Sequence, residues 1–189
     1  MTRTAIIGLG IMGRRMLEHM ARHDRFDPCL LWDPSPEACA AAGELAPHAA
    51  IAATAEQAIE RADCAYLACP PAPRAAYARR AAHLGKPLFL EKPLGVDVAE
   101  SRRLADELEA AGVPVAVNFT QAAGSALANV IAARDSGAMG ELAGVDIVVT
   151  YPHWPRAWQV AADWLRFRAE GGYTREVISH FIFFTERVL

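Results

Sequence analysis

The sequence predicts an α/β protein whose first 118 residues form a doubly wound parallel sheet. Six short apolar runs of strand length recur in this region, as expected for strands that are buried on both faces. Helix patterns separate them, which fits the crossovers that parallel strands need. A glycine-rich turn lies between the first strand and the first helix. After residue 118 the regular alternation of strand and helix patterns ends. The pattern in residues 119–189 predicts the beginning of a second, α+β domain.

The elements of the first domain can be located from these patterns. The expected strands are Thr4–Gly8, Pro28–Trp32, Ala50–Ala53, Cys64–Cys69, Pro87–Leu90 and Val113–Val117. The expected helices are Met12–His23, Pro36–Leu45, Ala55–Glu60, Arg74–Leu84 and Val98–Ala111. Ser35, Thr54 and Asp97 each precede a helix, where a side-chain oxygen can accept a hydrogen bond from a free backbone N–H.

The second region predicts two helices, Ala122–Ser136 and Thr174–Leu189, and one long strand, Leu142–Tyr151. A single strand does not make a stable sheet. The apolar stretch Val177–Phe184 also needs a surface to cover it. We therefore expect the second domain to be incomplete and the chain to form a homo-oligomer.

Composition limits the classes of partner. A net charge of −3 and a pI of about 6.1 provide no basic field for nucleic acid. No apolar stretch approaches the roughly 20 residues of a membrane span, and the start lacks a signal-peptide pattern. No histidine stands at ligand spacing beside the four cysteines, so no metal site is expected. These features favour a cytoplasmic protein with reduced thiols.

The turn Gly8-Leu9-Gly10-Ile11-Met12-Gly13 matches the dinucleotide-binding pattern G-x-G-x-x-G in the strand–turn–helix context that the pattern requires. Gly8 permits the tight turn, Gly10 lets a pyrophosphate approach the backbone, and Gly13 lets helix and strand pack closely. Ile11 and Met12 open the helix, whose free N–H groups point at the phosphates.

Asp33 ends the second strand, 20 residues after Gly13. A carboxylate there can accept hydrogen bonds from the ribose hydroxyls of NAD, and its charge repels the 2′-phosphate of NADP. No arginine follows it directly. The sequence therefore favours NAD, and Arg14 and Arg15 leave NADP open as the less favoured cofactor.

Five motifs together resemble the Gfo/Idh/MocA family of oxidoreductases: the glycine turn, Asp33, Cys69-Pro70-Pro71, Gly85-Lys86-Pro87 and Glu91-Lys92-Pro93. The resemblance implies a Rossmann domain followed by a mostly antiparallel sheet. It implies that Cys69, Pro70, Glu91 and Lys92 line the cofactor site. It also places Lys92 at the reaction centre and makes Lys92–Pro93 a candidate for a cis peptide bond.

Members of the family carry an aspartate followed four residues later by a histidine, after a glycine-rich turn. Here Glu176 stands in place of that aspartate, and His180 is four residues further on. Residues at this spacing share a helix face. A second departure is Arg74, which occupies the region where the family has a histidine after the fourth strand.

The resemblance implies an NAD-dependent dehydrogenase acting on a small polar substrate such as a polyol, sugar or cyclitol. Lys92 would stabilise the alkoxide, and either Lys92 or His180 would be the base, with Glu176 orienting them. Three tryptophans and an arginine could form a wall for the substrate or pack an irregular segment; they are Trp154, Trp158, Trp164 and Arg156.

Two alternatives remain at this point. The opening Gly8–Met16 also resembles the β-hydroxyacid dehydrogenases, but those continue into an all-helical domain, and Glu91-Lys92-Pro93 and the β-rich stretch Val145–Thr150 argue against them. The other is a non-catalytic NAD-binding sensor or an inactive fragment on the same fold, because a fold does not fix a function.

Overall fold

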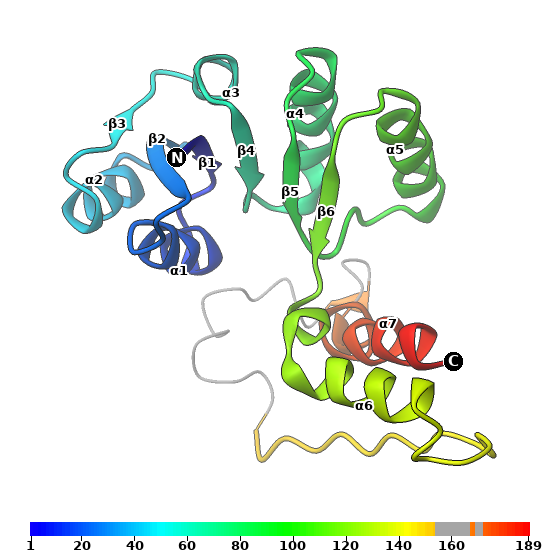
Figure 1. Ribbon diagram of the computed structural model, residues 1–189. Coiled ribbons are helices and arrows are strands. Elements are labelled where there is room, and N and C mark those ends of the chain that lie inside the picture. The colour runs from blue at the N-terminus through cyan, green and yellow to red at the C-terminus, as the bar shows by residue number, and fades with distance from the viewer. Residues whose placement is uncertain (154–166, 169–171) are drawn as a thin grey trace. The chain divides into compact units, whose positions relative to one another are not determined.

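A computed structural model describes residues 1–153, 167–168 and 172–189 (Figure 1). The chain divides into two compact units, Met1–Asn118 and Phe119–Leu189. The first is an α/β unit, and the second is helical in its described parts.

The first unit is built on one sheet of six parallel strands (Figure 1). The strands are β1 (Thr2–Ile7), β2 (Phe26–Trp32), β3 (Ala50–Ile51), β4 (Cys64–Leu67), β5 (Leu88–Glu91) and β6 (Val115–Asn118). Their order across the sheet is β3-β2-β1-β4-β5-β6, and all five pairs are parallel. This confirms the predicted doubly wound sheet. The order reverses between β1 and β4, which is where ligands of such sheets bind.

Five helices connect these strands. They are α1 (Ile11–Met20), α2 (Pro36–Leu45), α3 (Ala55–Arg61), α4 (Pro71–His83) and α5 (Val98–Ala110). Ser35, Thr54 and Asp97 cap α2, α3 and α5 as predicted, each accepting a hydrogen bond from a backbone N–H three residues on. Helix α4 begins three residues earlier than predicted, because prolines are tolerated in the first turn of a helix.

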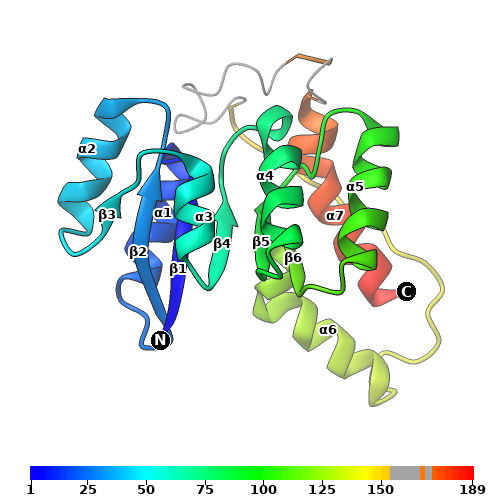
Figure 2. The same cartoon turned by 90° about the horizontal axis from the view of Figure 1, so that it is seen from above.

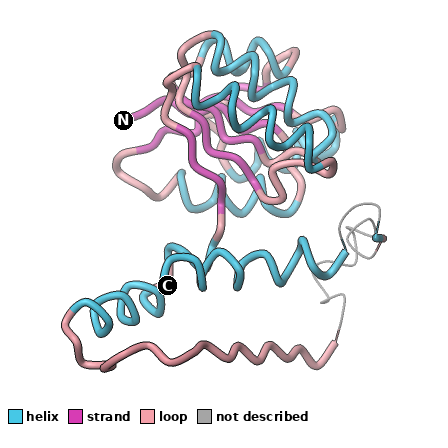
Figure 3. The backbone as a smooth tube through the Cα atoms, turned by 90° about the vertical axis from the view of Figure 1, so that its right-hand side faces the viewer, coloured by secondary structure: helices cyan, strands magenta, loops and turns pink. Residues whose placement is uncertain are grey.

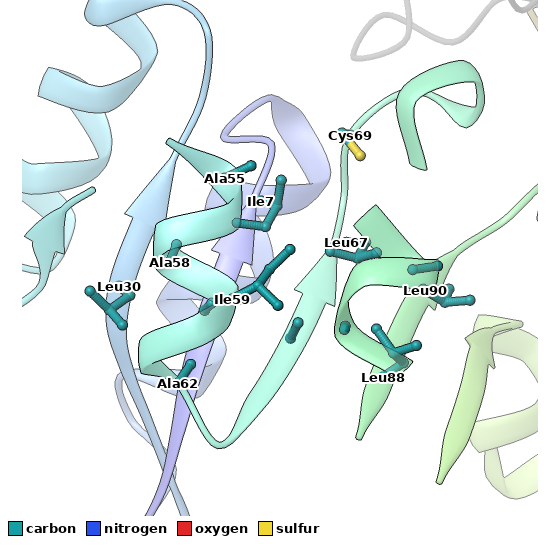
Figure 4. Packing of buried hydrophobic residues seen from close by; sticks show 14 of the residues in the cluster. Ile7, Leu30, Ala55, Ala58, Ile59, Ala62, Leu67, Cys69, Leu88 and Leu90 are labelled. Carbon is teal, nitrogen blue, oxygen red and sulfur yellow. The ribbon is translucent and has the colours of Figure 1, made fainter. Parts of the chain in front are cut away.

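Adjacent residues of the central strands pack on opposite faces of the sheet. Ile7 and Leu30 join a core with α3, α4 and α5, which follow one another along the sheet in Figure 2. Figure 4 shows Ala55, Ala58 and Ile59 of α3 against these strands. Ile6, Leu31 and Tyr66 belong to a separate core with α1 and α2. Two apolar cores therefore pack against the two faces of the sheet and fix the positions of its strand ends.

The described part of the second unit consists of helical segments and loops (Figure 3). The helical segments are η1 (Thr120–Ala123), α6 (Ser125–Asp135), the π-helical turn η5 (Thr174–Ile178) and α7 (Ser179–Val188). The two predicted helices are present, the second with a π-helical start.

The prediction of a long strand at Leu142–Tyr151 is wrong for this structure. Those residues lie in a loop, drawn in pink in Figure 3, and no strand occurs in the described part of the second unit. A β-strand needs a partner for its backbone hydrogen bonds, and none of the described segments supplies one. Val145, Ile147 and Val148 are exposed. The described residues therefore contain no antiparallel sheet.

Candidate active site

The glycine turn between β1 and α1 is shaped by close backbone contacts. Gly8 has a φ of +92°, and a Cβ at this position would lie 2.5 Å from the backbone nitrogen of Cys69. A Cβ on Gly13 would lie 1.8 Å from the carbonyl oxygen of Gly8. A Cβ on Gly10 would meet nothing within 4 Å. The outer two glycines therefore hold the turn together, while Gly10 leaves an open approach to the backbone.

The first turn of α1 offers donors for an anion. The helix begins at Ile11, its N-cap is Gly10, and no side chain caps it. The first N–H groups of a helix lack partners within the helix and favour negative charge. The open side of Gly10 and these donors fit a dinucleotide pyrophosphate.

Asp33 connects the end of β2 to the glycine turn. Its Oδ2 accepts a hydrogen bond of 2.7 Å from the N–H of Leu9, and its Oδ1 accepts one of 2.8 Å from the N–H of Ser35. An ionised carboxylate has about four acceptor positions, so further positions remain for ribose hydroxyls. Asp33 thus holds the turn in addition to the cofactor contact that the sequence predicts for it.

A buried polar cluster lies at the carboxyl ends of β4, β5 and β6. Glu91 is 5% exposed, and its Oε1 accepts hydrogen bonds from the hydroxyl of Tyr66 and, at 2.6 Å, from Nδ2 of Asn118. Burial, and secondarily the Glu91 carboxylate, raises the pKa of Tyr66 well above its ordinary value. Tyr66 and Asn118 are not among the site residues that the sequence predicts. The signal for Asn118 was available, because it is a polar residue that ends a strand.

Arg74 on α4 is buried, with 2% of its surface exposed. Its Nη1 donates hydrogen bonds to the backbone carbonyls of Glu91 and Pro93, and its Nη2 donates to the carbonyl of Cys69. Burial lowers the pKa of the guanidinium, although arginine stays charged in proteins. Arg74 therefore joins the end of β4 to the turn that follows β5.

Lys92 directly follows β5 and is half-buried. The Lys92–Pro93 peptide bond is cis, as predicted. In the segment after the neighbouring strand β4, Cys69 is buried and Pro70 is the exposed N-cap of α4. Burial raises the pKa of the Cys69 thiol, which disfavours its reactive thiolate.

Glu176 and His180 lie on the last helical stretch of the second unit. Glu176 is in the π-helical turn η5, and His180 is in the first turn of α7; both are half-buried. The imidazole meets the ring of Phe119 edge to face, with 5.7 Å between ring centres. Phe119 also stacks on Phe183 at 4.4 Å. Single π-helical turns are frequent at functional sites.

The structure thus gathers the predicted residues into groups within each unit. Gly8, Gly10, Gly13, Asp33 and Cys69 lie together at the carboxyl edge of the sheet. Glu91 ends β5 at the same edge, and Lys92 directly follows it. Glu176 and His180 form a separate group in the second unit. The tryptophan and arginine wall lies outside the described residues, namely Trp154, Arg156, Trp158 and Trp164.

Three further features concern the described residues only. The four cysteines are free thiols. No group of three or more histidine, cysteine or acidic side chains in the described ranges could hold a metal ion. Within those same ranges, no helix has the length and apolar character needed to cross a bilayer.

Comparison with known proteins agrees with this geometry. Residues 2–119 match the model of the GFO/IDH/MocA oxidoreductase family, NAD-binding Rossmann fold. A curated relative, the dTDP-3,4-didehydro-2,6-dideoxy-alpha-D-glucose 3-reductase of Streptomyces violaceoruber, is 32% identical over 159 residues, which is 83% of this chain and 44% of that protein.

Solved structures share the fold at lower identity. A protein from Sinorhizobium meliloti 1021, assigned as a myo-inositol dehydrogenase, superposes with a TM-score of 0.80 and 20% identity over 100% of this chain and 55% of its own. The WlbA dehydrogenase of Bordetella pertussis, solved with NADH and UDP-GlcNAcA, gives a TM-score of 0.67 and 24% identity over 74% of this chain and 41% of its own. The chain thus spans about half the length of these relatives.

Proposed function

This chain belongs to the Gfo/Idh/MocA family of oxidoreductases, and from that premise we propose that it binds NAD and acts in hydride transfer to or from a small polyhydroxylated substrate. The observation that carries the proposal is the open glycine turn, held by Asp33 and lying against Cys69 at the sheet edge that also carries Lys92. When bound, the nicotinamide supplies or accepts the hydride.

The proposed cofactor contacts come from the first unit. Gly10, Ile11 and Met12 would bind the pyrophosphate through backbone N–H groups. The remaining acceptor positions of Asp33 would bind the ribose hydroxyls, and its charge would disfavour a 2′-phosphate. Pro70 and Cys69 follow β4 on the side of the turn where the nicotinamide half would extend.

Cofactor preference tests this assignment. We expect isothermal titration to show NAD binding about tenfold or more tighter than NADP, because two like charges a few ångströms apart cost on the order of 1–4 kcal/mol. Asp33→Asn keeps an oxygen that can accept the hydrogen bond from the N–H of Leu9 but removes the negative charge. It should therefore reduce the ratio of NAD to NADP affinity. Asp33→Ala should also weaken the binding of both cofactors, because the glycine turn loses its hydrogen bond to the Asp33 carboxylate. NADP binding as tight as NAD would contradict the assignment.

The proposed chemistry uses residues of both units. When an alcohol loses hydride it also loses its hydroxyl proton, and His180 would accept that proton because imidazole titrates near neutrality. Lys92 would stabilise the negative oxygen with its ammonium group. Glu176 would orient His180 and balance the positive charge.

The relatives support a class of substrate. The curated relative is a reductase of a nucleotide-linked keto sugar, and several structural relatives are inositol dehydrogenases. We therefore propose a cyclitol or a sugar, free or nucleotide-linked, as the substrate.

Two measurements on the purified chain test the function as a whole. NADH fluorescence should report cofactor binding, and absorbance at the NADH band should report turnover with a panel of inositols, free sugars and nucleotide sugars. Binding with turnover on one class supports the proposal. Binding with no turnover on any class would instead assign the chain a cofactor-binding role without catalysis.

A further inference from the structure

The guanidinium of Arg74 contacts the backbone on both sides of Lys92. Nη1 binds the carbonyl of Glu91, immediately before Lys92, and the carbonyl of Pro93, immediately after it. Nη2 binds the carbonyl of Cys69, in the segment that lies against Gly8. One planar cation therefore bridges the strand-end turn that carries Lys92 and the strand end beside the glycine turn.

We propose that Arg74 is a positioning residue that sets the location of the Lys92 ammonium relative to the cofactor turn. The inference rests on the proposed function, in which Lys92 stabilises the reacting oxygen. A guanidinium suits this task because its donors are rigidly spaced in one plane and can serve several acceptors at once. A lysine has a single nitrogen on a flexible stem and cannot reproduce that geometry.

The contacts around Glu91 show that the backbone and the side chain of this residue are held separately. Its carboxylate is bound by Tyr66 and Asn118, whereas Arg74 binds its carbonyl oxygen. The strand end is thus already anchored through the side chain. What Arg74 adds is control of the two peptide groups that flank Lys92 and a link from them to Cys69.

Burial makes the arrangement sensitive to the identity of the cation. Arg74 is 2% exposed, and the nearby Glu91 carboxylate compensates its charge. The remaining nitrogen, Nε, is buried and meets no acceptor in the part of the chain that the structure describes. The two terminal nitrogens therefore carry all the contacts that the structure shows for this group.

The test compares Arg74→Lys with Arg80→Lys. Both keep the charge and both lie on α4, but Arg80 is half-exposed and forms an ion pair with Glu60 instead of contacting the turn. Because a misplacement of about 1 Å can cost on the order of 10²-fold in rate, we expect Arg74→Lys to lower kcat by roughly 10- to 100-fold with the Kd for NAD nearly unchanged. Arg80→Lys should change neither quantity.

A second readout needs no turnover. Lys86 and Lys92 are the only lysines of the chain, and Nζ of Lys86 is held by the carbonyl of Ala62, away from Arg74. Competitive labelling with acetic anhydride, measured by mass spectrometry, gives the reactivity of each lysine. Arg74→Lys should change the ratio of Lys92 to Lys86 labelling, and Arg80→Lys should not.

The outcomes separate this inference from the proposed function. If Lys92→Met leaves turnover intact while Arg74→Lys alters Lys92 labelling, the positioning role stands and the role of Lys92 in the reaction is wrong. If Lys92→Met abolishes turnover while Arg74→Lys changes neither kcat nor labelling, the positioning role is wrong.

A measurement on the unmodified chain covers the case in which Arg74→Lys does not fold. Hydrogen-bonded, buried guanidinium protons exchange slowly with solvent, and NMR of arginine side-chain nitrogens reports this exchange. The Nη protons of Arg74 should exchange much more slowly than those of Arg80. Equally fast exchange at the two residues would overturn the inference.

Discussion

In the first unit, polar groups at the carboxyl edge of the sheet find partners within the same unit, whereas in the second unit large apolar side chains remain exposed. The Glu91 carboxylate accepts hydrogen bonds from two side chains, and Arg74 donates hydrogen bonds to three backbone carbonyls. By contrast, Val148 of the second unit is 88% exposed and Ile182 is 52% exposed. The parallel sheet brings its strand ends to one edge and so builds a site locally, while in the second unit apolar side chains of a loop and of α7 are exposed.

The largest effect should come from the backbone packing of the glycine turn. Gly13→Ala places a Cβ on the carbonyl of Gly8, so we expect loss of the native fold in circular dichroism and loss of NAD binding. Gly10→Ala should fold normally and lose only NAD affinity, because its Cβ points into open space where the pyrophosphate would lie.

Gly43→Ala serves as the matched control for these glycine variants. It lies inside α2 with nothing near its Cβ, and alanine there should stabilise the unit by about 0.5–1 kcal/mol. A Gly13→Ala variant as stable as the parent would show that the turn adopts a different path.

The next largest effect concerns the two groups of candidate catalytic residues. Lys92→Met in the first unit and His180→Ala in the second should each lower kcat by about 10²-fold or more, with little change in NAD affinity, because general acid–base groups typically contribute 10²–10⁴-fold. Glu176→Gln should cost less, because this side chain orients and does not transfer the proton. Steady-state kinetics beside NAD titration provides the measurement.

Different results for the two units would be informative. If Lys92→Met loses NAD binding but keeps turnover at saturating NAD, then Lys92 is a cofactor ligand only. If His180→Ala has no effect while Lys92→Met does, His180 is not the proton acceptor.

A smaller effect is expected from alkaline pH, and it should arise in the first unit. Burial raises the pKa of Tyr66, Cys64 and Cys69, so the folded state holds these protons more tightly than the unfolded state. Their contribution to stability is complete at neutral pH and is lost as the pH rises above the unfolded values, about 8.5 for cysteine and 10 for tyrosine. Urea unfolding from pH 7 to 11 should show this decline.

Tyr66→Phe separates the tyrosine from the thiols. It should cost about 1–3 kcal/mol at neutral pH, because the buried Glu91 carboxylate loses a donor, and it should flatten the decline above pH 10. An unchanged alkaline slope would remove Tyr66 from the explanation.

The smallest expected effect on folding concerns self-association. This prediction tests the second unit directly. Ile147, Ile182 and Leu189 contribute to an apolar pocket in that unit, and we expect the chain to associate through such surfaces. Ile182→Lys should reduce the mass measured by light scattering at high concentration. Ile51→Lys, at an exposed isoleucine of the first unit, should not. A monomeric parent chain would contradict this expectation.

The same contrast explains what could be predicted from the sequence. The strands and helices of the first unit, the caps and the glycine turn follow from local patterns that tertiary packing reinforces, as at Ile6 and Ile7 on opposite faces. Leu142–Tyr151 was predicted as a strand from its valines and isoleucines, but strand formation depends on a partner that a local pattern cannot reveal.

The contacts of the side chains at the site are harder to predict from the sequence than the strands and helices. The sequence marks Arg74 only as a departure from a family pattern, because its three acceptors are backbone carbonyls of residues 69, 91 and 93. Tyr66 was indistinguishable from an ordinary core residue of β4. Asp33 was identified for its contact with a ribose, and its bonds to Leu9 and Ser35 become visible only in three dimensions.

The contacts of Arg74 have a consequence for how this site can be redesigned. Because the guanidinium binds carbonyl oxygens, its hydrogen bonds depend on the path of the chain at positions 69, 91 and 93. Among the side chains at these positions, that of Glu91 must stay, because it anchors the strand end and compensates the charge of Arg74. Exposed side chains that follow Cys69, such as those of Ala72 and Pro73, could then be exchanged while the carbonyl contacts of Arg74 are retained. A set of variants with different substrate preferences could thus share one position of the Lys92 ammonium group.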